Sequence, residues 1–126
     1  MGIKYIKLDK LQKEPLGNGK YKIHFRWLGK QNKYGQIALS RNAIFEPSAG
    51  GKDWINSFLK YIELAFRWKK PATISTHRVN YIGFLDEKNR EISLKKLSQL
   101  IGLILKKWPD IEFMTSVEFG DLICKK

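Results

Sequence analysis

Residues 20–27, Lys20-Tyr21-Lys22-Ile23-His24-Phe25-Arg26-Trp27, decide the fold because two kinds of side chain alternate strictly along them. Aromatic residues and Ile occupy every second position, and basic or titratable residues occupy the positions between. A period of two places alternate side chains on opposite faces of a β-strand. The pattern predicts a strand with one face on a core and the other bearing cations and no carboxylate.

The segments on either side of this strand predict its neighbours. Residues 34–41 alternate again, and a polar loop at 28–33 separates the two runs. We expect residues 20–27 and 34–41 to pair as an antiparallel hairpin. Upstream, residues 3–14 are predicted to hold a strand, and residues 15–19 (PLGNG) a turn, because Pro fixes φ and Asn-Gly permits positive φ.

Two later segments carry apolar residues at helical spacing. The first runs from Trp54 after Asp53, a suitable N-cap, and ends before Pro71. The second covers residues 94–108, with Ser93 as the predicted N-cap and Pro109 as the stop.

The remaining segments predict strands. Residues 73–85 are rich in Ile, Thr, Val and Tyr and predict one long strand or two short ones, followed by a charged turn at 86–90. Apolar residues at odd positions over 111–119 predict a last strand. The sequence therefore predicts the α+β class: a single basic domain over residues 1–126, with an antiparallel sheet and two amphipathic helices packed on one face of it.

Charge is the unusual property of the composition. The 126 residues include 24 Lys or Arg and 12 Asp or Glu, a net charge of +12, while 43% of residues are apolar, as in a globular protein. Residues 1–70 hold 15 of the basic and five of the acidic residues. A positive field concentrated in one half of the chain predicts a polyanionic partner.

Several classes of protein lack support in the sequence. The longest apolar run, residues 101–105, is too short for a membrane span, and no apolar segment follows Met1 as in a secretory signal. The lone Cys124 excludes an internal disulfide or a Cys-based zinc site. We expect a protein of the cytoplasm, or of the nucleus in a eukaryote, without cofactor, metal or membrane partner.

The predicted cationic face suits the repeating phosphates of a nucleic acid, because each neutralised phosphate releases counterions. Tyr34, in the basic loop, is predicted to stack on a base. Single-stranded DNA or RNA is favoured over duplex DNA, since neither helix clusters Arg, Asn and Gln for the major groove. The predicted nucleic-acid-binding residues are Lys20, Lys22, His24, Arg26, Lys30, Lys33, Tyr34, Arg41, Lys60, Arg67, Lys69 and Lys70.

Two other functions remain open. A small ribonuclease or phosphodiesterase would use His77 or His24 as general base. A phage- or plasmid-type interaction module or inhibitor would dock its positive charge on an acidic protein. A homodimer is also possible, because the predicted sheet has exposed edges.

Overall fold

The first helix has the cap and the stop that the sequence predicts. The computed structural model describes residues 2–84 and 86–125. Within them, α1 (Trp54–Arg67) begins after Asp53, whose carboxylate accepts a hydrogen bond of 3.1 Å from the backbone N–H of Asn56. The helix ends before Lys69, whose φ of 52° is left-handed. The prediction for this helix is confirmed.

The second helix, α2 (Glu87–Lys107), begins earlier than predicted. Its N-cap is Asp86, whose carboxylate accepts a 3.0 Å bond from the backbone N–H of Asn89. Ser93 is buried inside the helix, so the predicted cap at Ser93 and the predicted turn at 86–90 are wrong. The first turns are charged and lie outside the apolar stripe, which starts later than the helix itself.

The third helix, α3 (Ser116–Cys124), replaces the strand predicted over 111–119, which is wrong. Thr115 Oγ1 accepts a 3.3 Å bond from the backbone N–H of Glu118, and the Glu118 carboxylate accepts a 2.6 Å bond from the backbone N–H of Thr115. This reciprocal capping box satisfies two backbone donors that a helix start otherwise leaves unpaired. The Thr-x-x-Glu signal therefore outweighs the apolar alternation.

The described strands pair two by two. β2 (Leu11–Gly17) is antiparallel to β3 (Lys20–Phe25), whereas β1 (Tyr5–Asp9) is parallel to β4 (Ile37–Arg41) and β5 (Ala43–Ile44) is parallel to β6 (Ile74–Ser75). The chain is therefore a small α+β protein with three helices and a few short strands among its described residues, as the predicted class requires. The predicted hairpin between 20–27 and 34–41 is wrong.

The turn at residues 17–19 explains this exchange of partners. Gly17, Asn18 and Gly19 all have positive φ, of 86°, 50° and 71°, which makes a tight hairpin. β3 therefore finds its partner upstream in β2, and β4 pairs with β1. The predicted turn is confirmed, although the strand on its upstream side was assigned no partner.

Residues 73–84 contain less strand than predicted. After β6, the segment turns through a short 3₁₀ helix, Arg78–Asn80. The Asn80 amide Nδ2 donates a 2.8 Å bond to the carbonyl of His77 and holds this turn. β6 ends at Ser75, so the prediction of a longer strand is wrong, because the chain turns at residues 77–80; residue 85 lies outside the described residues.

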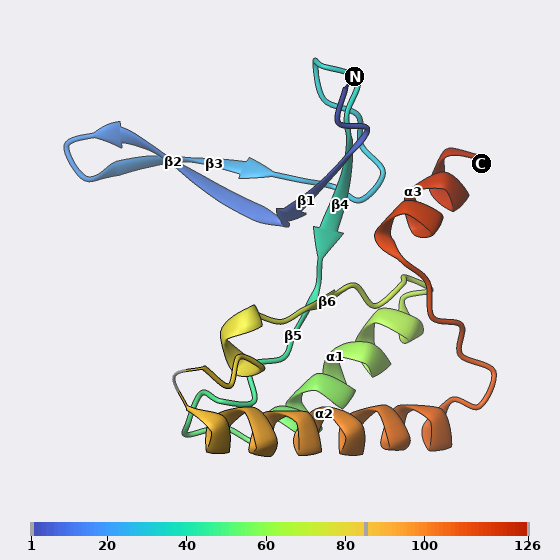
Figure 1. Ribbon diagram of the computed structural model, residues 1–126. Coiled ribbons are helices and arrows are strands. Elements are labelled where there is room, and N and C mark those ends of the chain that lie inside the picture. The colour runs from blue at the N-terminus through green and yellow to red at the C-terminus, as the bar shows by residue number, and fades with distance from the viewer. Residues whose placement is uncertain (1, 85, 126) are drawn as a thin grey trace. The chain divides into compact units, whose positions relative to one another are not determined.

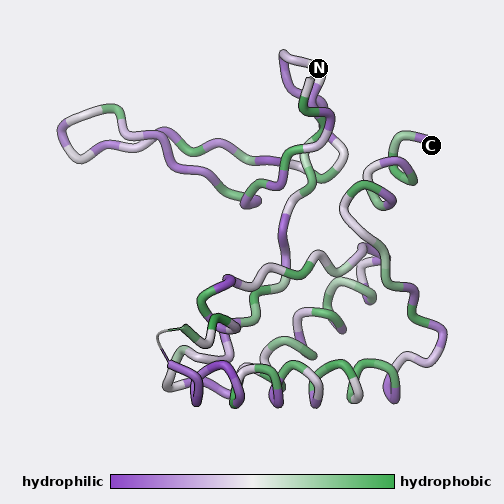
Figure 2. Tube along the Cα trace, viewed as in Figure 1, coloured by the Kyte–Doolittle hydropathy of each residue, from purple (hydrophilic) through white to green (hydrophobic). Residues whose placement is uncertain are grey.

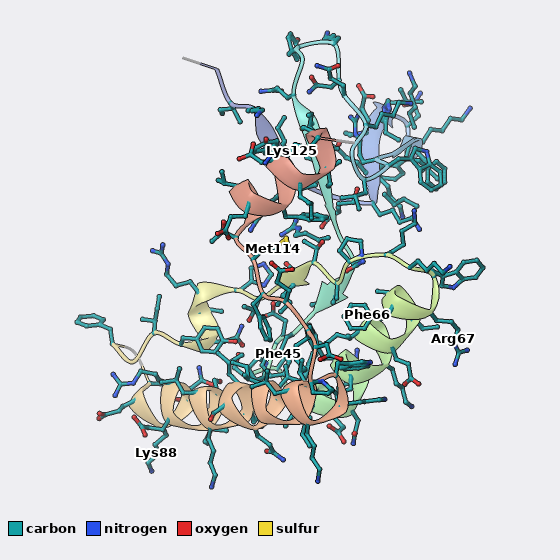
Figure 3. All side chains as sticks on the ribbon, turned by 90° about the vertical axis from the view of Figure 1, so that its right-hand side faces the viewer. Phe45, Phe66, Arg67, Lys88, Met114 and Lys125 are labelled. Atoms are coloured by element: carbon teal, nitrogen blue, oxygen red, sulfur yellow. The ribbon has the colours of Figure 1, made fainter. Side chains whose placement is uncertain are left out.

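The chain forms two compact units, Met1–Arg41 with Phe113–Lys126 and, separately, Asn42–Glu112. In the second unit, α1 and α2 bury their apolar faces against each other and β5, around Ala43, Phe45, Phe58, Ile62, Leu100 and Ile104. Figure 2 shows the hydrophobic residues of α2 on the side toward α1. In Figure 3, Phe45 lies over α2, whereas Lys88, at the start of α2, points away from this core. The predicted packing of both helices on one face of an antiparallel sheet is wrong, because the apolar faces of the helices pack on each other and on β5, which belongs to a parallel pair. One domain over 1–126 stays a prediction.

In the first unit, α3 packs against β1 and β4 (Figure 1). Gly120 lies so close to Tyr5 that an added Cβ would be 2.6 Å from the ring. The Tyr5 hydroxyl donates a short hydrogen bond to the Asp121 carboxylate, and Lys4 Nζ lies 3.1 Å from the same carboxylate. These two bonds lower the pKa of Asp121 below its usual range, and the bonds to Tyr5 and Asp121 raise the pKa of Lys4.

Candidate nucleic-acid interface

The β2–β3 ribbon, residues 11–25, extends away from the β1–β4 pair of its unit (Figure 1). All seven residues of β2 are exposed, and in β3 His24 is half-buried while the other residues are exposed. Residues that face each other across the strands share a side of the ribbon. One side therefore carries the pairs Leu11–Phe25, Lys13–Ile23 and Pro15–Tyr21, and the other carries Gln12–His24 and Glu14–Lys22.

The apolar side of the ribbon is open to solvent. Tyr21 is 60%, Phe25 57% and Trp27 55% exposed. The prediction that this side packs on a core is wrong, because β4, the strand expected to extend the sheet, pairs with β1 instead. The ribbon is thus amphipathic, with both sides accessible.

The polar side carries an acid as well as cations, so the prediction of no carboxylate there is wrong. Glu14 faces Lys22, and its Oε2 lies 2.7 Å from His24 Nε2. The bond from His24 lowers the pKa of Glu14. The Arg26 guanidinium donates to Gln12 Oε1 from Nε at 3.4 Å and from Nη2 at 3.3 Å, two long bonds that use two of its five N–H donors.

The loop after β3 presents Lys30, Lys33 and Tyr34 to solvent. The Asn32 side chain shapes this loop, because its Oδ1 accepts bonds of 2.9 Å and 3.0 Å from the backbone N–H groups of Tyr34 and Gln36. Tyr34 is 73% exposed, and Lys33 Nζ lies 4.9 Å from the centre of its ring. The loop therefore holds an aromatic ring and a cation side by side, both exposed to solvent.

The structure divides the predicted binding residues between the two units. Arg41, in β4, forms an ion pair of 2.8 Å with Asp9. Lys60, Arg67, Lys69 and Lys70 lie on α1 or just after it, in the second unit. The first unit contains the other members of the set, on the ribbon, in the loop after it and in β4: Lys20, Lys22, His24, Arg26, Lys30, Lys33, Tyr34 and Arg41.

Sequence reasoning missed a pocket of about 260 Å³ in the first unit, at the base of the ribbon. The rings of Phe25 and Trp27 lie nearly parallel, with centres 6.3 Å apart and planes 19° from each other. The period-two spacing of Phe25 and Trp27 indicates that the two rings lie on the same side of the strand. It does not indicate whether that side is buried or exposed. The pocket is lined by Ile6, Leu8, Gln12, Phe25, Arg26, Trp27, Lys30, Gln31, Asn32, Gln36 and Ala38.

A second polar cluster, in the other unit, surrounds His77. Its Nδ1 lies 2.7 Å from Glu46 Oε1, and the buried Asn80 donates through Nδ2 to Glu46 Oε2 at 2.7 Å. The Asn80 amide oxygen accepts a 3.1 Å bond from the backbone N–H of Ser48. No local pattern in the sequence indicates Glu46 as a partner of His77, because a contact between residues so far apart depends on the pairing of β5 with β6.

Among residues 2–84 and 86–125, no group of three or more His, Cys, Asp or Glu side chains is placed to hold a metal ion. In the same part of the chain, no helix combines the length and the apolar character needed to cross a bilayer. No protein-family model, no curated protein and no solved structure matches the chain.

Proposed function

We propose that the chain binds nucleic acid without cleaving it, through the β2–β3 ribbon and the loop over residues 28–36. The observation that carries this proposal is the exposed amphipathic ribbon, with Lys20 and Lys22 among its polar residues and Phe25 on its aromatic side. Residues 1–41 hold ten Lys or Arg and two Asp or Glu. Cations on one side attract phosphates, and rings on the other offer bases a surface for stacking.

Single-stranded DNA or RNA is the favoured ligand. A two-stranded ribbon also fits the major groove of duplex DNA, so the width of the ribbon alone does not decide. Exposed aromatic rings do favour single strands, whose unpaired bases stack on side chains. Phe25, Trp27 and Tyr34 are all more than half exposed.

The first test compares the affinities of labelled single-stranded DNA, duplex DNA and RNA by fluorescence anisotropy over a range of salt concentrations. For Lys20→Ala/Lys22→Ala we expect weaker binding and a log–log salt slope shallower by about 1.4 on a single strand, since two phosphate contacts are lost. The matched control is Lys95→Ala/Lys106→Ala, which removes two exposed lysines from α2.

The control variant should bind as the wild type does. Equal losses in the two variants would mean that net charge, and not the ribbon, determines affinity. Absence of binding by the wild type at low salt would contradict the proposal and leave an acidic protein as the partner to seek.

The His77–Glu46 pair supports a second candidate, the small ribonuclease. A carboxylate bound to Nδ1 keeps a proton on that nitrogen and leaves Nε2 as the acceptor. Nε2 would take the proton of a ribose 2′-hydroxyl as its oxygen attacks the adjacent phosphorus. The bond from phosphorus to the leaving 5′-oxygen would break, and that oxygen would take a proton from water.

Labelled RNA distinguishes the two candidates on a gel. If His77 is the base, His77→Ala lowers cleavage by about 10²- to 10⁴-fold. His24→Ala tests the other candidate base, whose partner Glu14 lies on the ribbon, and a loss of cleavage in that variant alone would assign the base to His24 instead of His77. Intact RNA with the wild-type protein would remove the enzyme from consideration.

A further inference from the structure

The pocket at the base of the ribbon combines an aromatic wall, formed by two stacked rings, with a small volume. Phe25 and Trp27 form the wall, and the half-buried Ile6 and Leu8 with the buried Ala38 form an apolar floor. Its volume of about 260 Å³ lies just below the range of roughly 300–1,000 Å³ that is typical of pockets for drug-sized ligands. A volume of this size, beside two aromatic rings, suits one small ring system.

Hydrogen bonds to three backbone carbonyls connect the segments that line the pocket. The Arg26 N–H donates to the Lys10 carbonyl at 2.8 Å, which ties the end of the ribbon to the start of β2. Ser40 Oγ donates to the Arg26 carbonyl at 2.7 Å, and the Ala38 N–H donates to the Lys30 carbonyl at 3.0 Å. The aromatic wall and the loop are therefore both attached to β4.

Residues with side-chain amides, among them Gln12, Asn32 and Gln36, also line the pocket and supply hydrogen-bonding groups. Asn32 Nδ2 donates to Gln36 Oε1 at 2.9 Å, which fixes the orientation of the Gln36 amide. Gln36 Nε2, which has no partner among the described residues, keeps two N–H donors for a carbonyl oxygen or ring nitrogen. Gln12, opposite, accepts from Arg26 through Oε1 and likewise retains its amide N–H donors.

The charge around the pocket favours an anion beside the ring. Arg26 and Lys30 line it, and Lys10 Nζ lies 5.6 Å from the centre of the Trp27 ring. The carboxylates of residues 1–41 are Asp9, paired with Arg41, and Glu14, bound to His24. A flat heteroaromatic ring with a phosphate attached through a sugar meets all these requirements.

We propose that this pocket takes one unpaired base of a nucleic acid strand, stacked on Phe25 and Trp27, with the flanking phosphate on Arg26 or Lys30. This inference rests on the proposed function, and it names the part of the ligand that the first unit recognises. Bases of single strands are commonly stacked on aromatic side chains and hydrogen-bonded along their edges. DNA and RNA share this chemistry.

The experiment measures anisotropy with three labelled strands of equal length, about 12 nucleotides: oligo(dT), oligo(rU) and a fully abasic DNA strand with the same phosphates. The wild-type protein should bind oligo(dT) about 5- to 150-fold more tightly than the abasic strand, which corresponds to stacking of one base. Trp27→Ala should lower this preference by the contribution of one stacked base, since Tyr34 keeps its exposed ring, and retain the affinity for the abasic strand. Phe25→Ala should give the same pattern independently.

Trp68→Ala is the matched control, because Trp68 is an exposed tryptophan of the second unit. It should leave the preference for bases unchanged, and an equal loss in this variant would overturn the pocket. Equal wild-type affinity for oligo(dT) and abasic strands would also overturn the pocket but leave the proposed nucleic-acid binding intact. Binding to none of the three strands would refute both. The ranking of oligo(rU) against oligo(dT) identifies RNA or DNA as the source of the base.

Discussion

The ribbon strand β3 and the helix α1 carry similar apolar side chains but bury them to opposite extents. Tyr21 and Phe25 of β3 are more than half exposed, whereas Phe58 and Ile62 of α1 are almost completely buried. The difference lies in the neighbours. α1 meets α2 and β5 on its apolar side, while β3 pairs only along its edge with β2.

This comparison separates two uses of apolar residues. A hairpin with two strands is marginally stable alone, so the ribbon gains its order from its attachment to β1 and β4 at its base. An exposed apolar patch on a protein surface commonly marks a binding site. We therefore expect the apolar residues of α1 to determine stability and those of the ribbon to determine binding.

Truncation of a core ring should show the largest effect. Phe58→Ala removes a buried side chain that packs edge-on against Phe45, with ring centres 5.6 Å apart. We expect a loss of about 3–5 kcal/mol in the free energy of unfolding, measured by urea titration with circular dichroism.

Phe25→Ala is the matched variant on the ribbon, where the lost ring is exposed. Its free energy of unfolding should stay within about 0.5 kcal/mol of wild type. A loss comparable with that of Phe58→Ala would mean that the ribbon's apolar side is covered in solution.

A smaller loss is expected where α3 meets β1. Gly120→Ala places a Cβ 2.6 Å from the Tyr5 ring, so the helix or the ring must shift, at a cost of about 1–3 kcal/mol. Gly102→Ala is the control, because a Cβ at Gly102 in α2 meets no described atom within 4 Å. There we expect a gain of about 0.5–1 kcal/mol from the lower backbone entropy of Ala in a helix, and equal changes in the two variants would refute this packing.

The smallest effect should be a dependence of stability on pH that arises from Asp121. The hydrogen bond from Tyr5 lowers the pKa of Asp121 in the folded protein, so the folded state binds fewer protons than the unfolded state near the usual Asp pKa of about 3.9. The contribution of Asp121 is complete above that value and is lost as the pH falls through the folded pKa. Asp121→Asn should therefore reduce the acid dependence of the free energy of unfolding.

Tyr5→Phe tests the cause of that shift, because it removes the hydroxyl donor and keeps the ring against Gly120. Urea titrations between about pH 5 and pH 2 should show part of the Asp121→Asn effect in this variant. A slope in Asp121→Asn equal to that of wild type would contradict the assignment.

The elements that local signals define could be predicted from the sequence, and those that depend on distant partners could not. Asp53 marks the start of α1 and Pro71 follows its end, and both signals act over only a few residues. The Asn18-Gly19 turn likewise determines a hairpin from local conformation. β1 and β4 pair in parallel although the whole ribbon lies between them in the sequence. Period-two alternation within a strand carries no information about which distant strand will be its partner. The capping box of α3 is itself a local signal, but the apolar alternation over residues 111–119 competes with it and predicts a strand.

The candidate site divides in the same way. The alternation of cationic and aromatic residues over 20–27 predicted the two sides of β3, because that period is a property of the strand alone. Exposure of the aromatic side, the partnership of Glu14 with His24 and the pocket beside Trp27 all follow from pairings over a distance. Such contacts are set by tertiary structure.

The bond between Tyr5 and Asp121 joins residues 116 positions apart, with all of the second unit between them. On the ribosome, at about 5–20 residues per second, Asp121 is added roughly 6–23 s after Tyr5. Throughout that interval β1 and β4 lack the helix that packs on them, whereas the buried core of the second unit is complete once Ile104 has been added, before α3 is made. The order of synthesis therefore favours folding of the second unit before the first. Until α3 has been made, the N-terminal segment of the nascent chain is the part on which a chaperone would act or from which aggregation would start.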